Sequence, residues 1–208
     1  MFKKNIIKPD ELQNENLVVY KQIEKLKTNA KVVVDTKHRA VIIKDGNVSE
    51  VLQSGEYKPF TKDDKKKRIV IAFVYVAKIS ELEFSTRVSS VKDNVQGAIY
   101  NLSFSGKYTF AVRNERKFLG TCFNSGSDFS RYDFYEEIEK SVNANILSYI
   151  IDFFVNGKVP FEKFEKANEK LNHHVETALD KYLDDTFGLE VRSVNVTEMF
   201  IQDKIATK

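Results

Sequence analysis

Residues 100–112 read YNLSFSGKYTFAV, and their side chains alternate in character along the whole stretch. Aromatic and aliphatic residues occupy the even positions, and polar residues occupy the odd positions as far as Lys107. Successive side chains of a strand point to opposite faces, so this stretch predicts a long strand with one buried face. Gly106 interrupts the buried face without changing its parity, and we expect a bend or a bulge there.

Short β-branched runs separated by turn residues predict further antiparallel strands upstream. The runs at 39–44 and 48–52 flank Asp45-Gly46, a pair typical of a hairpin turn because both residues adopt positive φ at low cost. The run at 69–76 is apolar without alternation. That pattern predicts a strand covered on both faces and therefore central in its sheet.

Beyond these strands the hydrophobic period changes from two to about 3.6 residues. Apolar residues recur every four positions across 134–154, which predicts an amphipathic helix. We expect Ser130 or Asp133 to cap its start. Asn156-Gly157 is expected to end it with a residue in the left-handed region.

A second helix and a last strand complete the predicted order. Apolar residues line one helix face from Phe164 to Leu183, with Pro160 before that run and Gly188 after it. Residues 189–199 alternate again and predict a strand. The chain is therefore predicted to be an α+β protein. Its antiparallel or mixed sheet carries two consecutive amphipathic helices on one side and ends in a closing C-terminal strand.

The N-terminal stretch differs from the rest in composition. Residues 1–30 are rich in Asn, Glu and Lys, and we interpret them as a loose arm with one short extended piece at 17–20. Residues 31–202 are predicted to form one domain, since a chain of this length can bury a substantial core. Residues 203–208 are predicted to be a short tail that ends abruptly, as in an excised domain of a longer protein.

Composition excludes several classes of function. The 33 basic and 30 acidic side chains give a net charge of +3, without the concentrated basic face that nucleic acid requires. The single cysteine, Cys122, can form no disulfide within the chain, which favours a reducing, cytoplasmic location. Apolar runs fall well short of the roughly 20 residues that span a bilayer, and the N-terminus carries no signal-peptide or myristoylation pattern. Any membrane contact is therefore expected to be peripheral or to be made through a segment outside this sequence.

The order of these elements and three short motifs resemble the SPFH domain, also called the band 7 or prohibitin-homology domain. The motifs are a strand–glycine turn–strand unit at 39–57, a strand leading into paired helices at 106–118, and a return from helix to last strand at 187–196. The resemblance spans roughly residues 30–202. The opening hairpin and the C-terminal portion are most similar to a bacterial and viral branch of virion-core-like SPFH proteins.

This resemblance implies a non-catalytic scaffold that forms homo-oligomers, binds other proteins and organises them at or near a membrane surface. Family members usually carry an N-terminal apolar or acylated anchor and a coiled-coil tail, and we find neither pattern in residues 1–31 or 203–208. Membrane attachment and higher-order assembly therefore do not follow from these segments. The alternative is a monomeric soluble adaptor that binds a peptide or an anionic lipid headgroup.

Residues able to carry chemistry do not form a recognisable pattern. His173 and His174, with Glu169 one turn earlier, supply too few converging ligands for a metal ion, and we interpret them as a solvated helix face. Cys122 has no histidine nearby in sequence and is interpreted as a small structural thiol in a loop before the helix.

Paired carboxylates at 136–137 and 184–185 fall on the predicted helices, where neighbouring acids are typical of a solvated face. We predict no catalytic, metal-binding or cofactor-binding residue, no cofactor and no enzymatic activity. An active site formed by residues that come together only in the folded structure is not excluded, because one sequence does not reveal such residues.

The charged loop at 62–68 contains the one binding hypothesis that rests on named residues. Lys65, Lys66, Lys67 and Arg68 are predicted to contact an anionic lipid or another acidic surface, at roughly 1 kcal/mol per basic residue near a charged membrane. The alternative is a solvated loop between strands, since two neighbouring aspartates offset part of the charge. No aromatic residue interleaves with the basic ones, which disfavours nucleic acid.

Overall fold

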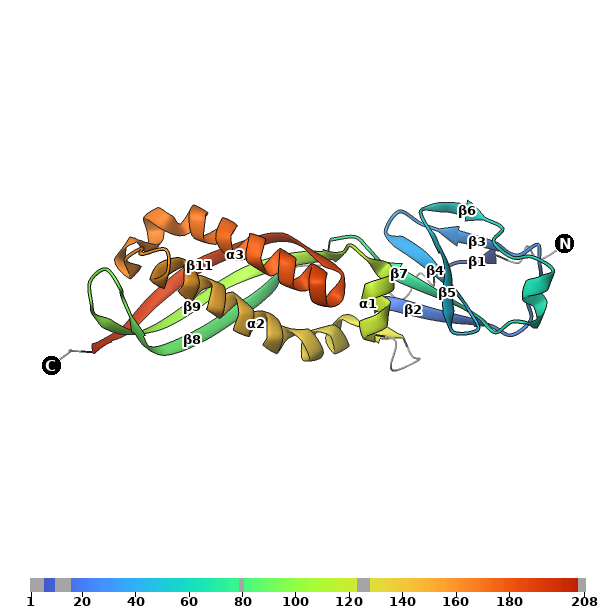
Figure 1. Cartoon of the computed structure of the whole chain (residues 1–208). Coiled ribbons are helices and arrows are strands. Elements are labelled where there is room, and N and C mark those ends of the chain that lie inside the picture. Colours follow the sequence, from blue (N-terminus) through green and yellow to red (C-terminus); the bar gives the residue numbers. More distant parts are fainter. Residues whose placement is uncertain (1–5, 10–15, 79–80, 123–127, 206–208) are drawn as a thin grey trace. The chain divides into compact units, whose positions relative to one another are not determined.

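The computed structural model describes residues 6–9, 16–78, 81–122 and 128–205 (Figure 1). The chain forms two compact units. Unit 1 comprises Met1–Ala77 and Val112–Tyr135, and unit 2 comprises Lys78–Ala111 and Glu136–Lys208. Each unit is therefore built from two separate segments of the sequence, and no single linker divides the chain into the two units.

Unit 1 contains two sheets. The five-stranded sheet has the order β10 (Phe129–Ser130), β2 (Asn16–Ile23), β7 (Ile69–Tyr75), β4 (His38–Lys44) and β5 (Asn47–Leu52), with antiparallel neighbours throughout. The three-stranded sheet consists of β1 (Ile6–Ile7), β3 (Lys31–Val34) and β6 (Gly55–Tyr57), with β1 parallel to β3. Strand β7 pairs with β2 and β4 on its two sides, which confirms the prediction of a central strand.

Strand β2 differs from the loose arm predicted for residues 1–30. Leu17 and Val18 are fully buried, and Val19 lies opposite Phe73 of β7. The apolar run at 17–20 therefore belongs to the core of unit 1. The polar residues on both sides of this run concealed a strand that pairs from Val18 to Ile23 with the apolar strand β7.

The core of unit 1 lies among strands of both sheets. Its buried cluster includes Val19, Ala30, Val32, Val34, Ala40, Ile42, Leu52, Phe60, Ile69, Ile71 and Phe73. Helix α1 (Glu115–Cys122) adds the fully buried Phe118, whose ring centroid lies 6.3 Å from that of Phe129. The sequence predicted a loop around Cys122. This prediction is wrong as far as Cys122, which is the last residue of α1. Residues 123–127 lie outside the described part of the chain.

The β4–β5 hairpin has the predicted turn. Asp45 and Gly46 both have positive φ, at 51° and 82°. The turn is also fastened to the start of β7: the Asp45 N–H donates to the Arg68 carbonyl at 2.9 Å, and the Arg68 N–H donates to Asp45 Oδ1 at 2.9 Å. These two hydrogen bonds fix the end of the charged loop at 62–68, which precedes β7.

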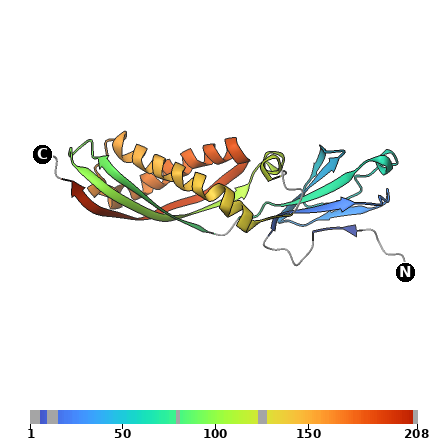
Figure 2. The same ribbon diagram turned by 90° about the horizontal axis from the view of Figure 1, so that it is seen from below.

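Unit 2 is a three-stranded sheet with two long helices on one face (Figure 2). The strand order is β11 (Leu189–Ile205), β9 (Ile99–Val112) and β8 (Leu82–Lys92), and the helices are α2 (Arg131–Val155) and α3 (Phe164–Phe187). Strands β8 and β9 are antiparallel. Contacts of Ser105 with Thr197 and of Thr109 with Ser193 run in opposite directions, so β9 and β11 are antiparallel too.

Strand β9 confirms the alternation from which the fold was predicted. Its even positions are buried, namely Tyr100, Leu102, Phe104, Gly106, Tyr108, Phe110 and Val112. The bend or bulge expected at Gly106 is not seen, because the irregularity of this hairpin lies on β8 between Val88 and Val91. Gly106 serves close packing instead: a Cβ there would lie 2.2 Å from the Asn195 carbonyl oxygen and 2.6 Å from the Phe84 ring.

Helix α2 begins at a reciprocal cap formed by both predicted residues. The Asp133 N–H donates to Ser130 Oγ at 3.2 Å, and the Ser130 N–H donates to Asp133 Oδ2 at 2.8 Å. Hydrogen bonds from the Ser130 side chain and backbone lower the pKa of Asp133. The sequence signal for the start of this helix is therefore confirmed at both positions.

The end of α2 differs from the prediction in one residue. Lys158, and not Gly157, has positive φ, at 53°. Gly157 is needed for another reason, since a Cβ there would lie 2.2 Å from the Phe153 carbonyl oxygen. Gly188 ends α3 in the left-handed region at φ 69°, as the sequence predicted.

Helix α3 satisfies the outer edge of β11 with side-chain amides. Asn168 Nδ2 donates to the Val196 carbonyl at 2.7 Å, and Asn172 Oδ1 accepts the Val196 N–H at 2.8 Å. Asn172 Nδ2 also donates to Asn168 Oδ1 at 2.9 Å, which fixes the pair. Together the two asparagines replace the peptide group that a neighbouring strand would supply. We call Asn168 and Asn172 the asparagine clamp.

The β8–β9 turn is organised by one buried carboxylate. Asp93 is 2% exposed, and its Oδ1 accepts the N–H groups of Val95 at 2.8 Å and Gln96 at 2.9 Å. Its Oδ2 accepts the N–H of Phe161, at the start of the short helical turn η3 (Phe161–Lys163) before α3, at 3.1 Å. Asp93 thus joins the hairpin to the connection between the two helices.

Candidate interaction surfaces

Side chains suited to metal binding do not converge in the described residues. No group of three or more His, Cys, Asp or Glu side chains among them is placed to hold a metal ion. His173 and Glu169 are exposed, whereas His174 is half buried, with Nε2 3.2 Å from Asp152 Oδ2. The two histidines therefore do not share the solvated face that we predicted. Within the described residues, no helix is both long and apolar enough to cross a membrane.

The basic loop, residues 62–68, folds around a buried carboxylate. Its short helical turn η1 spans Asp63–Lys66, and Asp64 is only 1% exposed. The Asp64 carboxylate accepts the Thr61 N–H at 2.9 Å and the Thr61 hydroxyl at 3.1 Å. It also binds Lys44 Nζ at 2.9 Å and Lys67 Nζ at 3.2 Å. The Thr61 N–H and the Lys44 ammonium hold the pKa of Asp64 well below its usual range.

This arrangement changes how the charge of the basic loop is distributed. Asp64 was expected to offset the loop's cations as a solvated acid, but it is buried and shared between β4 and the loop. Lys65, Lys66 and Arg68 are exposed and form no ion pair with any residue in the described ranges. Lys67 is exposed as well, although its ammonium reaches Asp64. The four predicted contact residues therefore lie together on one exposed, anchored loop.

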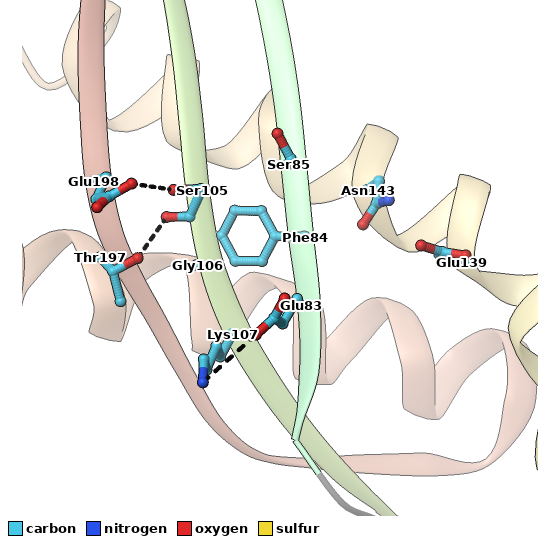
Figure 3. A pocket seen from close by; sticks show the side chains of 10 residues that line it. All are labelled: Glu83, Phe84, Ser85, Ser105, Gly106, Lys107, Glu139, Asn143, Thr197 and Glu198. Atoms are coloured by element: carbon cyan, nitrogen blue, oxygen red, sulfur yellow. Dashed lines mark hydrogen bonds and ion pairs between the residues drawn. The ribbon is translucent and has the colours of Figure 1, made fainter.

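A second surface, which the sequence did not predict, lies in unit 2 (Figure 3). A hollow of about 460 Å³ opens beside Gly106, with lining residues from β8, β9, β11 and α2. The Phe84 ring lies next to Gly106, while Glu139 and Asn143 come from α2 and Glu198 comes from β11. We call this feature the acidic hollow.

The acidic hollow contains more negative than positive side chains. Three carboxylates line it, those of Glu83, Glu139 and Glu198, against the single cation Lys107. Lys107 Nζ lies 3.6 Å from Glu83 Oε1, and Glu198 Oε2 accepts the Ser105 hydroxyl at 3.0 Å. Glu139 is exposed and forms no ion pair with any described residue. The net charge of the lining favours a cationic ligand.

One polar atom in the wall of the acidic hollow lacks a hydrogen bond. Asn143 Oδ1 is buried, and no described residue donates to it. A buried acceptor without a donor costs roughly 1–3 kcal/mol. Periodicity did predict that residue 143 lies on α2, but it carried no information about which strand residues face it.

Comparison with known proteins identifies one relationship. A family model described as the SPFH domain-Band 7 family matches residues 66–208, well over half of the chain. No curated protein matches the sequence. The match begins within η1 and includes α2, α3 and the whole sheet of unit 2. The hairpin motif at 39–57 lies upstream of the matched residues.

Proposed function

The chain belongs to the SPFH domain-Band 7 family, and from this premise we propose that it is a non-enzymatic scaffold domain that self-associates and organises partner proteins. Proteins of this family are typically membrane-associated scaffolds that oligomerise. The observation that carries the proposal is the family match over residues 66–208. We further propose that the domain works in the cytoplasm, in peripheral contact with the inner face of the membrane.

Exposed apolar residues on β11 support a role in protein binding. Phe200 is 56% exposed and Ile201 is 42% exposed, although both lie in a long strand. They follow the segment of β11 whose edge is occupied by the asparagine clamp. Successive side chains of a strand point to opposite faces, so each face of this end of β11 carries one exposed large apolar side chain, and a partner that enclosed the strand would bury both.

Self-association is tested by sedimentation velocity and light scattering of the chain across a wide range of concentration. We expect the weight-average mass to rise with concentration and to fall again on dilution. A chain that stays monomeric at every concentration would contradict the scaffold proposal and favour a monomeric adaptor.

A second candidate function is attraction of the basic loop to an anionic lipid surface. The observation that favours it is that Lys65, Lys66 and Arg68 are exposed on a loop held in place by Asp64. Each basic residue near an anionic membrane contributes roughly 1 kcal/mol, or about a five-fold change in binding. The proposed contact is peripheral and requires no inserted segment.

Flotation with vesicles of phosphatidylserine and phosphatidylcholine tests the lipid contact. We expect Lys65→Ala with Lys66→Ala to reduce flotation, and the matched control Lys166→Ala with Lys170→Ala on α3 to leave it unchanged. Equal flotation of both double variants would remove the lipid role from the basic loop.

A further inference from the structure

We infer that the basic loop of one copy docks into the acidic hollow of a second copy of this chain. The inference rests on the self-association proposed above and assigns it two specific surfaces. The loop, residues 62–68, belongs to unit 1, and the hollow beside Gly106 belongs to unit 2. The contact is therefore between two different surfaces of the same sequence.

The two surfaces are complementary in charge. Residues 62–68 contain five basic and two acidic side chains, and one of these acids, Asp64, is buried against Lys44 from β4. The hollow is lined by three carboxylates and one ammonium group. Opposite charges on two patches speed encounter and fix orientation, so each surface is the one that the other attracts.

The Glu139 carboxylate in the hollow specifies the kind of group that enters. Lysine and arginine side chains carry only hydrogen-bond donors, three and five respectively. A cationic side chain from the loop can therefore pair with Glu139, which is exposed and forms no ion pair with any described residue. An acidic or apolar segment would leave this carboxylate without a partner.

Both surfaces are held in shape before they meet. The loop is fixed by Asp64 and by the hydrogen bonds between Asp45 and Arg68, and the hollow by the close approach of Phe84 to Gly106. Surfaces that need no rearrangement lose less free energy on association.

Such a contact has consequences for assembly. A pairing between two different patches leaves one free loop and one free hollow on every pair, so further copies can add in the same orientation. The result is a closed ring or an open filament, depending on the rotation between neighbours. A scaffold built this way grows without a second type of interface.

Charge reversal tests the contact on the full chain. The first variant carries Glu83→Lys and Glu139→Lys in the hollow, and the second carries Lys65→Glu and Lys66→Glu in the loop. None of these four side chains is buried, and only Glu83 forms an ion pair that the structure shows, with Lys107. We expect each variant alone to associate at least about ten-fold more weakly than the wild type, since like charges then face each other.

Mixing the two variants provides the decisive measurement. The reversed loop of one then meets the reversed hollow of the other, and every contact again joins opposite charges, so association is expected to return toward the wild-type level. Matched controls on α3 carry the same changes in charge at exposed positions: Glu165→Lys with Glu169→Lys, and Lys166→Glu with Lys170→Glu. These two controls are expected to associate like the wild type, alone and mixed.

The outcomes separate this inference from the proposed function. Self-association of the wild type that all four double variants retain would overturn the loop-and-hollow contact and leave the scaffold proposal intact. A wild-type chain that never self-associates would instead refute the scaffold proposal. If the loop variant loses only vesicle flotation, the partner of the loop is lipid and the inference is wrong.

Discussion

Each unit of the molecule buries one aspartate, and the two are neutralised in opposite ways. Asp64 in unit 1 accepts hydrogen bonds from Thr61 and pairs with the ammonium groups of Lys44 and Lys67. Asp93 in unit 2 accepts only backbone N–H groups, from Val95, Gln96 and Phe161, in the contacts described above. One buried carboxylate interacts with side-chain cations, and the other with backbone N–H groups.

This difference matches what each aspartate holds in place. The cations that pair with Asp64 come from side chains. The strength of these ion pairs therefore depends on salt and pH, and substitution of either lysine weakens them. The N–H groups that neutralise Asp93 cannot be mutated away, so only the aspartate itself is vulnerable. Ion pairs of Asp64 with lysine side chains thus hold the exposed basic loop, whereas hydrogen bonds of Asp93 with backbone N–H groups hold the β8–β9 turn.

Replacing Asp93 should produce the largest loss. Asp93→Ala leaves the buried Phe161 N–H without an acceptor and releases the N–H groups of Val95 and Gln96, and we expect the free energy of unfolding of unit 2 to fall by about 3 kcal/mol. Hydrogen exchange of peptides from unit 2 measures this loss, with peptides from unit 1 as internal reference. Asp93→Asn keeps one acceptor oxygen and should lose less; equal losses in both variants would contradict the backbone-anchor interpretation.

Replacing Asp64 should produce a smaller loss, confined to unit 1. Asp64→Ala removes the partner of Lys44 and of the Thr61 N–H, and we expect unit 1 to lose about 2 kcal/mol, since its cations can turn to solvent. Hydrogen exchange of residues 62–75 measures the change. Protection of unit 2 should be unaltered, and a matching loss there would break the contrast between the two units.

Acid should narrow the gap between the wild type and Asp64→Asn. The folded-state pKa of Asp64 is lowered, so its stabilising contribution is complete above the unfolded pKa near 4 and is lost as pH falls toward the folded value. By pH 3 about 1 kcal/mol of the difference between the two proteins should have disappeared. Chemical denaturation of both from pH 7 to pH 3 measures it, and a gap independent of pH would argue against an ionised Asp64.

The smallest effect separates the two lysines that bind Asp64. Lys67 is 40% exposed and should contribute about 0.5 kcal/mol, whereas the 18%-exposed Lys44 should contribute about twice that. Thermal unfolding of Lys67→Ala and Lys44→Ala compares them directly. A larger effect at Lys67 would show that the loop, and not β4, supplies the main counter-charge.

Local patterns were enough to predict most of the elements of this fold. Alternation located β9, the Asp45-Gly46 pair located the β4–β5 turn, and the four-residue period located α2 and α3. Their assembly was harder to predict. Strand β2 was hidden by its polar flanks, and the division into two units follows from long-range contacts that leave no trace in local composition.

The candidate surfaces show the same limit more strongly. The basic loop was visible as a run of charges, but nothing in that run distinguished the buried Asp64 from the exposed Asp63 beside it. The acidic hollow combines residues from β8, β9, β11 and α2, so it exists only once the unit has folded. A surface assembled from distant segments has no signature in a single sequence.

The asparagine clamp has a consequence for how this domain exchanges hydrogen with water. The outward-facing amide of an edge strand normally exchanges rapidly, because no neighbouring strand protects it. The Val196 amide donates to Asn172 Oδ1 and is expected to exchange when α3 moves away from β11 or when the Asn172 side chain rotates. Its exchange rate therefore reports the attachment of the helix, separately from the pairing of the strands. A single amide can thus show whether assembly loosens or tightens the helical layer of unit 2.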